Sequence, residues 1–308
     1  MKISMRVPGT MKVAAMIQPW EAELTTDQIC EAVQLADELG FYKAMMGEHF
    51  IVPNEHVPLS GDYYFHGAVA LAWIAGCTKN IRLSSSVIIL PLQNPIVQAK
   101  AASTIDMLSK GRFEPIYGVG WLKEEYDMLN VDFHVRGKMF EEYIQAMKVL
   151  WTEESPVFKG DFVSFENAGF APKPVQPNGI PLWFGGDAPA VIKRVGRYAN
   201  GWSPFQTPPE KFPEMMEIIK SQPEYDDRDI GIFFALEMLN VGAHHEIKGD
   251  ERSKGDWDAN KIVEQCQWLK TLGVTETIIP VPPVEDFEAY KDRLRWTAAE
   301  VMPKLAAI

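Results

Sequence analysis

The sequence predicts a closed (β/α)8 barrel, the TIM-barrel architecture, from two observations. Short apolar runs of strand length alternate with helix-periodic runs along almost the whole chain, and strict alternation of this kind implies parallel strands connected by helical crossovers. The 308 residues contain eight such units, which is the number that closes a barrel. An open, doubly wound sheet is the alternative, but no GxGxxG pattern follows the first expected strand.

Four strand–helix units are expected in the first half of the chain. The strands are 13–17, 41–46, 81–90 and 111–120, and the helices are 26–39, 68–77, 95–108 and 137–151. Gly40 ends the first helix as glycine does at a helix terminus, and Thr26 or Asp27 is expected to cap its start.

The second half supplies four more units. The strands are 181–184, 201–205, 231–240 and 275–281, and the helices are 188–199, 209–220, 258–272 and 285–303. Between the two halves, VFKGDFVSF predicts a small β-hairpin that turns at Lys159–Gly160–Asp161, and APKPVQPNG predicts an extended connection. We interpret residues 153–180 as an excursion at one rim, so that residues 1–308 form a single domain.

Composition excludes several classes of protein. The net charge of −12 and the lack of a basic run argue against a nucleic-acid partner. No apolar stretch is long enough to cross a bilayer, and the first twenty residues are too interrupted for a secretion signal. Cys30, Cys77 and Cys266 show no CxxC spacing, which predicts buried thiols in a reducing cytoplasm. No group of His, Cys, Asp and Glu has metal-ligand spacing, so no metal is expected.

The barrel prediction also places a candidate site, because ligands bind at the carboxyl ends of barrel strands. The residues that this rule brings together are Gln18, Gly47, Glu48, His49, Ser85, Ser86, Val87, Gly118, Gly120, Trp121, Gly185, Gly186, Asp187, Trp202 and Ser203. Two glycines directly before a helix predict an anion site on main-chain N–H groups, with a merely tight turn as the alternative. In that site the carboxylate of Asp187 must turn away from the anion.

Aromatic and charged residues near the expected strand ends complete the candidates. Six aromatic residues are candidates for the wall of an apolar substrate pocket, with a core position as the alternative for each: Trp20, Tyr63, Tyr64, Phe65, Trp121 and Trp202. Glu124 and Glu125 are interpreted as solvated charges on a helix. His244–His245 stands in a polar stretch that predicts a surface loop or a lid.

Five segments in combination carry a family resemblance. They are GFYKAMMGEHFIVP (40–53), IRLSSSVIILPLQNPIVQAKAASTIDMLSKGRF (81–113), GVGWLKEEYDMLNVDFHVRGKMFEEYIQAMKVLW (118–151), APKPVQPNGIPLWFGGDAPAVIKRVGRYANGW (171–202) and LGVTETIIP (272–280). Together they resemble the luciferase-like flavin-dependent monooxygenases, in particular the branch called coenzyme F-420-dependent oxidoreductases. The resemblance covers most of the chain.

The resemblance implies a flavin-type ring standing in the barrel mouth. It implies a non-prolyl cis peptide at Ser86–Val87 against the ring, and His49 beside the reactive centre as a hydrogen-bond donor or acid–base group. Glu48 is expected to point away and orient other groups. The implied cofactor contacts are Glu48, Ser86, Val87, Gly118, Gly120, Trp121, Gly185, Gly186, Asp187 and Ala188. The expected substrate contacts are Gln18, Trp20, Tyr64 and Trp202.

Three functions follow from the resemblance. The first is a monooxygenase that acts on a small organic substrate with dioxygen and reduced FMN, which a separate flavin reductase supplies. The second is hydride transfer from reduced coenzyme F-420, an 8-hydroxy-5-deazaflavin. The third is a flavin-binding protein without turnover. Relatives often pair through helices on the outer face, so a homodimer is expected.

Two positions depart from the family pattern. Trp121 stands where relatives that oxidise sugar phosphates carry a glutamate, so we do not expect that reaction. Ile116 stands where a glycine is common and is expected to narrow the room for a long phosphate tail, which favours FMN over the deazaflavin.

Overall fold

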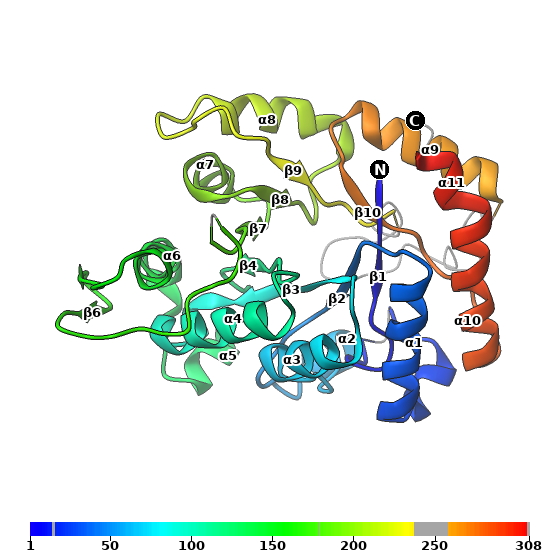
Figure 1. The fold of residues 1–308 in the computed structure, drawn as a ribbon, viewed down its shortest axis with the longest axis horizontal. Helices are drawn as coiled ribbons and strands as arrows, with labels where there is room; N and C mark the ends of the chain where they lie inside the picture. The colour runs from blue at the N-terminus through cyan, green and yellow to red at the C-terminus, as the bar shows by residue number, and fades with distance from the viewer. Residues whose placement is uncertain (14–15, 178, 237–257, 307–308) are drawn as a thin grey trace.

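The computed structural model describes residues 1–13, 16–177, 179–236 and 258–306. Eight parallel strands pair in the order β10-β1-β2-β3-β4-β7-β8-β9. A parallel bridge between Phe233 and Glu276 connects the two ends of this order, so the sheet closes on itself. Helices surround the ring of strands (Figure 1). The predicted (β/α)8 barrel is confirmed.

The barrel strands are short, and each is followed by at least one helix. The strands are β1 (Lys2–Arg6), β2 (Lys43–Met46), β3 (Arg82–Ile89), β4 (Ile116–Gly118), β7 (Trp183–Gly185), β8 (Gly201–Ser203), β9 (Gly231–Ile232) and β10 (Glu276–Ile278). The main helices are α1 (Thr26–Glu38), α3 (Gly67–Cys77), α4 (Pro95–Leu108), α6 (Arg136–Thr152), α7 (Pro189–Tyr198), α8 (Phe212–Lys220), α9 (Ala259–Thr271) and α10 (Phe287–Trp296). Three shorter helices are α2 (Val57–Ser60), α5 (Lys123–Met128) and α11 (Met302–Ala306).

The prediction of the first strand was wrong. The strand is β1, which pairs with β2 and β10. The described residues of the expected strand, 13 and 16–17, lie between β1 and α1, where the Ile17 N–H donates to the Val13 carbonyl (2.9 Å). Lys2 and Arg6 at the two ends of KISMR concealed the strand in the sequence. The three residues between them are buried, because only the ends of a barrel strand reach the two rims.

Most other predicted elements differ from the structure at their ends, and one differs in its interior. Thr25, not Thr26 or Asp27, caps α1, since its hydroxyl accepts the Gln28 N–H (3.3 Å). The expected helix 285–303 is divided by a π-helical turn between α10 and α11. His244–His245 and the end of the expected strand 231–240 lie outside the described residues.

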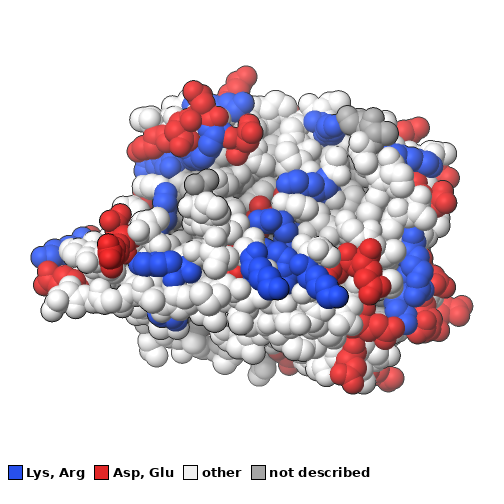
Figure 2. Space-filling view, viewed as in Figure 1, with Lys and Arg blue, Asp and Glu red and all other residues white. Residues whose placement is uncertain are grey.

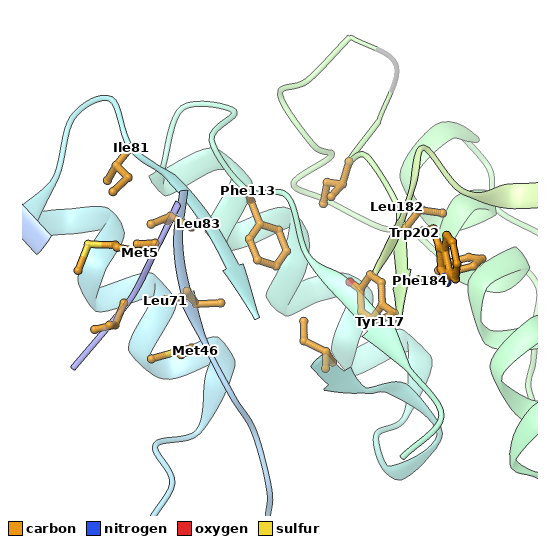
Figure 3. Packing of buried hydrophobic residues seen from close by; sticks show 14 of the residues in the cluster. Met5, Met46, Leu71, Ile81, Leu83, Phe113, Tyr117, Leu182, Phe184 and Trp202 are labelled. Atoms are coloured by element: carbon orange, nitrogen blue, oxygen red, sulfur yellow. The ribbon is translucent and has the colours of Figure 1, made fainter. Parts of the chain in front are cut away.

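The hydrophobic core lies mainly between the ring of strands and the helices. Figure 3 shows Met5, Leu71 and Leu83 on the side of α3, with Phe184 and Trp202 further along the ring. A second, smaller cluster fills the barrel interior: Met45, Ile116, Trp183, Phe233 and Ala235. The barrel is therefore packed through its centre, and open space is left at the mouth.

A buried ionic cluster lies near the amino-terminal end of the barrel. The fully buried Lys43 places its Nζ 2.8 Å from Glu276 Oε2 and 3.2 Å from Glu114 Oε2. Arg82 Nε and Trp183 Nε1 also donate to Glu114, at 3.0 and 3.2 Å. Burial alone would raise the pKa of Glu114, but the Lys43 and Arg82 cations lower it below its ordinary value. One lysine thus forms ion pairs with two buried carboxylates.

The predicted hairpin within 153–180 is confirmed as a two-stranded excursion outside the barrel. β5 (Phe158–Lys159) and β6 (Ser164–Phe165) are antiparallel and lie beyond α6 at one edge of the molecule (Figure 1). Glu142 of α6 holds the turn, because its carboxylate accepts the N–H groups of 161–163 at 2.8–2.9 Å.

Charged groups of both signs are interspersed on the face drawn in Figure 2. Within the described ranges, no helix combines the length and apolarity required to span a bilayer.

Candidate functional site

A cavity of about 530 Å³ opens at the carboxyl ends of the strands. This volume lies in the range of cofactor and small-molecule pockets. All eight strands, or the residues directly after them, contribute to its wall: Arg6, Met46, Val87, Gly118, Gly185, Ser203, Phe233 and Ile278. The cavity is therefore where the barrel rule places a ligand.

Most of the predicted site residues line this cavity. They are Gly47, Glu48, His49, Tyr64, Ser86, Val87, Gly118, Gly120, Trp121, Gly185, Gly186, Asp187 and Ser203. Seven other candidates do not line it: Gln18, Trp20, Tyr63, Phe65, Ser85, Ala188 and Trp202. The sequence analysis also missed lining residues, among them Arg6, Met11 and Met16, because these belong to the misplaced first strand and its connection.

Gln18 and Trp20 fasten the connection after β1 to the last helix–strand unit. The Gln18 amide donates to the carbonyl of Pro282 (3.0 Å) and accepts the Val284 N–H (2.8 Å). The Trp20 ring packs against Tyr290 of α10 at a centroid distance of 4.9 Å. Their assignment to the substrate pocket depended on a first strand at 13–17, and neither residue lines the cavity.

Trp202 and Ala188 lie next to the turn after β7, outside the cavity lining. Trp202 is completely buried on the helix side of β8 and contacts Phe212 at 5.3 Å, while its Nε1 donates to the Gly186 carbonyl (2.8 Å). Ala188 is the N-cap of α7. Successive strand residues face opposite sides, so Ser203 lines the cavity and Trp202 does not.

The third strand carries the expected irregularity. The Ser86–Val87 peptide is cis, and the register with β4 shifts between Ser86 and Ile88. Val87 lines the cavity. The implied non-prolyl cis peptide is confirmed at the predicted bond.

The glycines of β4 and β7 make room for Val87. A Cβ atom on Gly118 would lie 2.7 Å from Val87 Cγ2, and one on Gly185 would lie 2.6 Å from Val87 Cγ1. A Cβ on Gly120, whose φ is +66°, would lie 2.8 Å from Ile89 Cγ2. Gly186, with φ +123°, differs: the nearest atom to its Cβ position is at 3.5 Å. Close packing therefore explains why Gly118, Gly120 and Gly185 lack a side chain. At the Gly186 turn, contact with an anion stays a prediction.

Replacing Gly185 with alanine is expected to lower the free energy of unfolding by about 1–3 kcal/mol, because the new methyl group overlaps Val87. The same replacement in a Val87→Ala background is expected to cost much less. Urea denaturation of the two single variants and the double variant measures this coupling. Gly76→Ala is the matched control, since its Cβ position is open. Equal costs in both backgrounds would contradict the interlock.

Asp187 turns away from the Gly186 turn toward the loop after β8. Its carboxylate accepts the N–H groups of Phe205, Gln206 and Thr207 at 2.9–3.1 Å and the Thr207 hydroxyl at 2.6 Å. These four neutral donors stabilise the carboxylate and direct it toward the loop after β8, as the sequence analysis required for an anion site at the Gly186 turn.

His49 is held at the cavity by a buried carboxylate. Its Nδ1 lies 2.8 Å from Oε2 of Glu125, and Oε1 of Glu125 accepts the Phe50 N–H (2.6 Å). Glu125 is 1% exposed and His49 is 11% exposed. With Nδ1 engaged by a carboxylate, Nε2 is the ring nitrogen left for a molecule in the cavity. A histidine oriented in this way can accept or donate a proton at one defined atom.

The interpretation of Glu125 as a solvated charge was wrong. It lies on α5, which begins directly after the mouth of β4, and its neighbour Tyr126 is also buried. The two adjacent acidic residues on one short helix concealed the fact that only Glu124 faces outward. The position of α5 at the mouth was the signal that could have identified Glu125.

Glu48 points away from His49, as expected, toward the start of α3. Its oxygens accept the Gly67 N–H and the Gln93 amide, both at 3.0 Å. Burial raises the pKa of Glu48 from 4.5 to about 7, and the nearby charge of Glu125 adds to this, although N–H donors from Gly67 and Ile89 oppose it. Among the described residues, the donors that reach the Glu48 carboxylate are neutral N–H groups.

Replacing Glu48 with glutamine is expected to change the pH dependence of stability. The folded state holds the Glu48 proton up to about pH 7 and the unfolded chain only to about 4.5, so wild-type stability falls as pH rises between these values. The loss is on the order of 1 kcal/mol per pH unit. The free energy of unfolding of the variant should not fall in this way, so its stability relative to the wild type should increase from pH 4.5 to 7. Urea midpoints at several pH values test this, and parallel curves would contradict it.

Aromatic side chains enclose His49. Tyr64 and Trp121 meet its ring edge-on at centroid distances of 5.0 and 6.2 Å. The Tyr64 hydroxyl donates to the Ser60 carbonyl (2.5 Å), which fixes its ring in place. Trp121 is 41% exposed and stands at the rim. The remaining wall is largely apolar and rich in methionine, a side chain that adapts to different ligand shapes.

Ile116 does not narrow the mouth. It is fully buried in the cluster inside the barrel and is not part of the cavity lining. Side-chain alternation along β4 directs it to the barrel axis below Val87. The preference for FMN that rested on Ile116 therefore has no support.

Three potential metal ligands meet outside the cavity, which the spacing along the sequence did not suggest. The ligand atoms of Glu55, His56 and Glu124 lie within 4.8 Å of one another at the partly exposed rim. His56 also contacts the outer side of Trp121, with centroids 5.6 Å apart. Acidic groups often meet in this way at surfaces without binding a metal.

Comparison with known sequences places this chain in a family. The family model described as luciferase-like monooxygenase matches residues 9–239. An uncharacterised protein of Mycobacterium tuberculosis is 33% identical over 279 residues, which span 85% of this chain and 91% of the relative. The pyrimidine monooxygenase RutA of Allorhizobium ampelinum is 26% identical over 234 residues, which span 70% of this chain and 61% of the relative.

Solved structures share the fold. The monooxygenase RslO1 from Streptomyces bottropensis has a TM-score of 0.78 at 20% identity, with 99% of this chain and 100% of that chain covered. The coenzyme F420-dependent tetrahydromethanopterin reductase from Methanopyrus kandleri gives 0.72 at 16% identity, covering 98% and 99%. The oxygenating constituent of 3,6-diketocamphane monooxygenase from Pseudomonas putida, in complex with FMN, gives 0.70 at 15% identity, covering 99% and 98%.

The family model matches three quarters of the chain, and the barrel carries the cis peptide and the mouth cavity that the resemblance implied. This protein therefore belongs to the luciferase-like monooxygenase family.

Proposed function

We propose that this protein is a monooxygenase that oxygenates a small organic substrate with reduced FMN and dioxygen in the mouth cavity. The observation that carries the proposal is the His49–Glu125 pair, which presents one imidazole nitrogen to a mostly apolar cavity. Similarity to the pyrimidine monooxygenase RutA supports the oxygenation. The source of reduced FMN would be a separate reductase, and the chain would act in the cytoplasm as a homodimer.

The cavity residues fit a flavin. The interlocked Val87, Gly118 and Gly185 give one wall without long side chains, against which a planar ring can lie. The Gly186 turn leads into α7, and main-chain N–H groups at a helix start suit a phosphate. The Asp187 carboxylate is directed instead toward neutral donors of the loop after β8.

When bound, reduced FMN supplies the two electrons with which one atom of dioxygen becomes water while the other enters the substrate. The chain's own residues provide the surroundings. Glu125 fixes the His49 ring, and Nε2 of His49 delivers or accepts a proton. Tyr64, Trp121 and the methionines exclude water, so that reactive species are not lost to hydrolysis.

Hydride transfer from reduced coenzyme F420 is the second candidate, since structural relatives include F420-dependent enzymes. The same His49 would donate the proton that completes reduction of the substrate. Dioxygen separates the two functions, because a deazaflavin does not activate it.

Titration of the purified protein with FMN and, separately, with coenzyme F420 is the first test. We expect saturable binding of FMN, followed by incorporation of ¹⁸O from ¹⁸O₂ into members of a small-molecule panel when a reductase regenerates reduced FMN. Binding of F420 alone would overturn the proposal in favour of hydride transfer. Flavin binding with no turnover in any variant would favour the non-catalytic alternative.

A further inference from the structure

Two cysteines that are far apart in the sequence lie against each other on neighbouring helices. Gln34, one turn after Cys30 on α1, donates its amide to the Cys77 carbonyl at the end of α3 (3.1 Å). The Cys77 thiol donates to the Trp73 carbonyl (3.3 Å), and Cys30 is near enough to contribute to the raised pKa of the Cys77 thiol. Both cysteines are partly exposed, whereas Cys266 is buried.

The contact between these helices is fixed by other bonds as well. Asp37, in the last turn of α1, accepts the N–H groups of Asn80 and Ile81 at 2.9 and 2.7 Å. These residues follow Cys77 closely. Gln34 and Asp37, both on the carboxyl-terminal side of Cys30, therefore hold this half of α1 against the end of α3.

We propose that Cys30 and Cys77 form a reversible disulfide, making this contact a redox-sensitive modification site. The inference is independent of the flavin chemistry. Disulfides of this kind in reducing compartments are usually transient and redox-sensing. The bond would enclose β2 and His49, since both lie between the two cysteines in the chain.

The order of the chemical steps follows from the surroundings of the two sulfurs. Burial raises the pKa of the Cys77 thiol to about 12, with a contribution from Cys30, so Cys77 stays protonated at neutral pH. Because the Cys77 thiol is engaged by the Trp73 carbonyl, we assign the first step to Cys30. Its thiol gives its proton to solvent and its sulfur attacks hydrogen peroxide, so that an S–O bond forms, the O–O bond breaks and the departing hydroxide takes up a proton as water. Cys77 then attacks the Cys30 sulfur, an S–S bond replaces the S–O bond, and the departing hydroxide takes the Cys77 proton as water. Two thiols are oxidised and one peroxide is reduced to two waters.

The test treats the full-length protein with hydrogen peroxide, then counts thiols with a chromogenic disulfide reagent under denaturing conditions. Three free cysteines should fall to one, with a mass loss of about 2 Da that dithiothreitol reverses. Peptide mapping should join the peptides of Cys30 and Cys77. The bond is also expected to raise Tm relative to the reduced protein, because it restricts the unfolded chain.

Variants provide matched controls. Cys266→Ala should still lose two thiols and form the bond, whereas Cys30→Ala and Cys77→Ala should not. Cys77→Ala should instead trap Cys30 as a sulfenic acid, which dimedone labels. Differential alkylation of the wild-type protein gives the same information should a variant fail to fold. Oxidation that leaves three thiols, adds oxygen to Cys30 without loss of Cys77, or joins two chains would overturn the proposal.

Discussion

Replacing His49 with alanine is expected to lower kcat/KM by about 10²–10⁴-fold, the usual contribution of a positioned acid–base group. His49 is the imidazole whose ring is fixed by Glu125 and encased by Tyr64 and Trp121. FMN affinity should change little, because the interlocked glycines and the Gly186 turn are unaffected. The measurement is the rate of ¹⁸O incorporation with the substrate found in the panel.

Added imidazole distinguishes a chemical role of His49 from a structural one. A small imidazole can occupy the vacated space beside Glu125 and should restore part of the lost rate to His49→Ala. His56→Ala is the matched control, since His56 contacts Trp121 from the outer side and is not part of the cavity lining. We expect it to retain wild-type turnover. An unchanged rate in His49→Ala would remove His49 from the mechanism.

Glu125→Gln tests how the ring is held. The amide oxygen can accept either the Phe50 N–H or the His49 Nδ1–H, but the amide nitrogen cannot replace the second acceptor. A loss smaller than that of His49→Ala is therefore expected, and imidazole should not rescue it because the histidine is still present. Equal turnover in Glu125→Gln and the wild type would show that the buried carboxylate is not needed for orientation.

Replacing Lys43 with methionine is expected to destabilise the fold by about 3–5 kcal/mol, since it removes the buried cation next to Glu276 and leaves Glu114 with Arg82 alone. Glu276 and Glu114 lie 2.8 and 3.2 Å from Lys43 Nζ, and Glu276 is 1% exposed. Methionine has a similar length, so the cost comes from charge and not from a cavity. Thermal and urea denaturation measure the effect. Because the free energy of unfolding of a typical domain is only about 5–15 kcal/mol, a loss of this size would leave the variant partly unfolded at 37 °C.

The matched control removes the stranded charges together with the lysine. Lys43→Met combined with Glu114→Gln and Glu276→Gln should recover most of the stability, because replacing a whole buried ionic group costs much less than removing one partner. A triple variant as unstable as the single one would show that packing of the lysine stem, and not its charge, is responsible.

The elements of this fold that could be predicted from sequence are those with a clear hydrophobic periodicity and with proline or glycine at their ends. α4 begins at Pro95 and ends at Leu108 as expected, because a proline and an apolar stripe mark it. β1 was missed because the charged residues at its two ends, Lys2 and Arg6, leave an apolar run too short to indicate a buried strand. Lys43 in the middle of a strand gave no sign that it was buried, because its two partners lie 71 and 233 residues away along the chain.

The same contrast applies to the site. His49 and Val87 were found through their position at strand ends and the family pattern. The place of α5 after a barrel strand put Glu125 near the mouth, but its partners His49 and Phe50 are about 75 residues earlier in the chain, so no local pattern indicated the contact. The glycines were found, but their reason was only visible in three dimensions, where the Val87 side chain occupies the space of two absent methyl groups.

The interlock of Val87 with Gly118 and Gly185 has a consequence for how the pocket can diversify. None of the three can change size alone without a clash or a void, so substitutions there must arrive in pairs and in a permitted order. Trp121, at the rim and partly open to solvent, carries no such constraint. Substitutions that change substrate range, natural or engineered, should therefore occur mainly around the opening of the cavity. Val87, Gly118 and Gly185 should stay unchanged or change together.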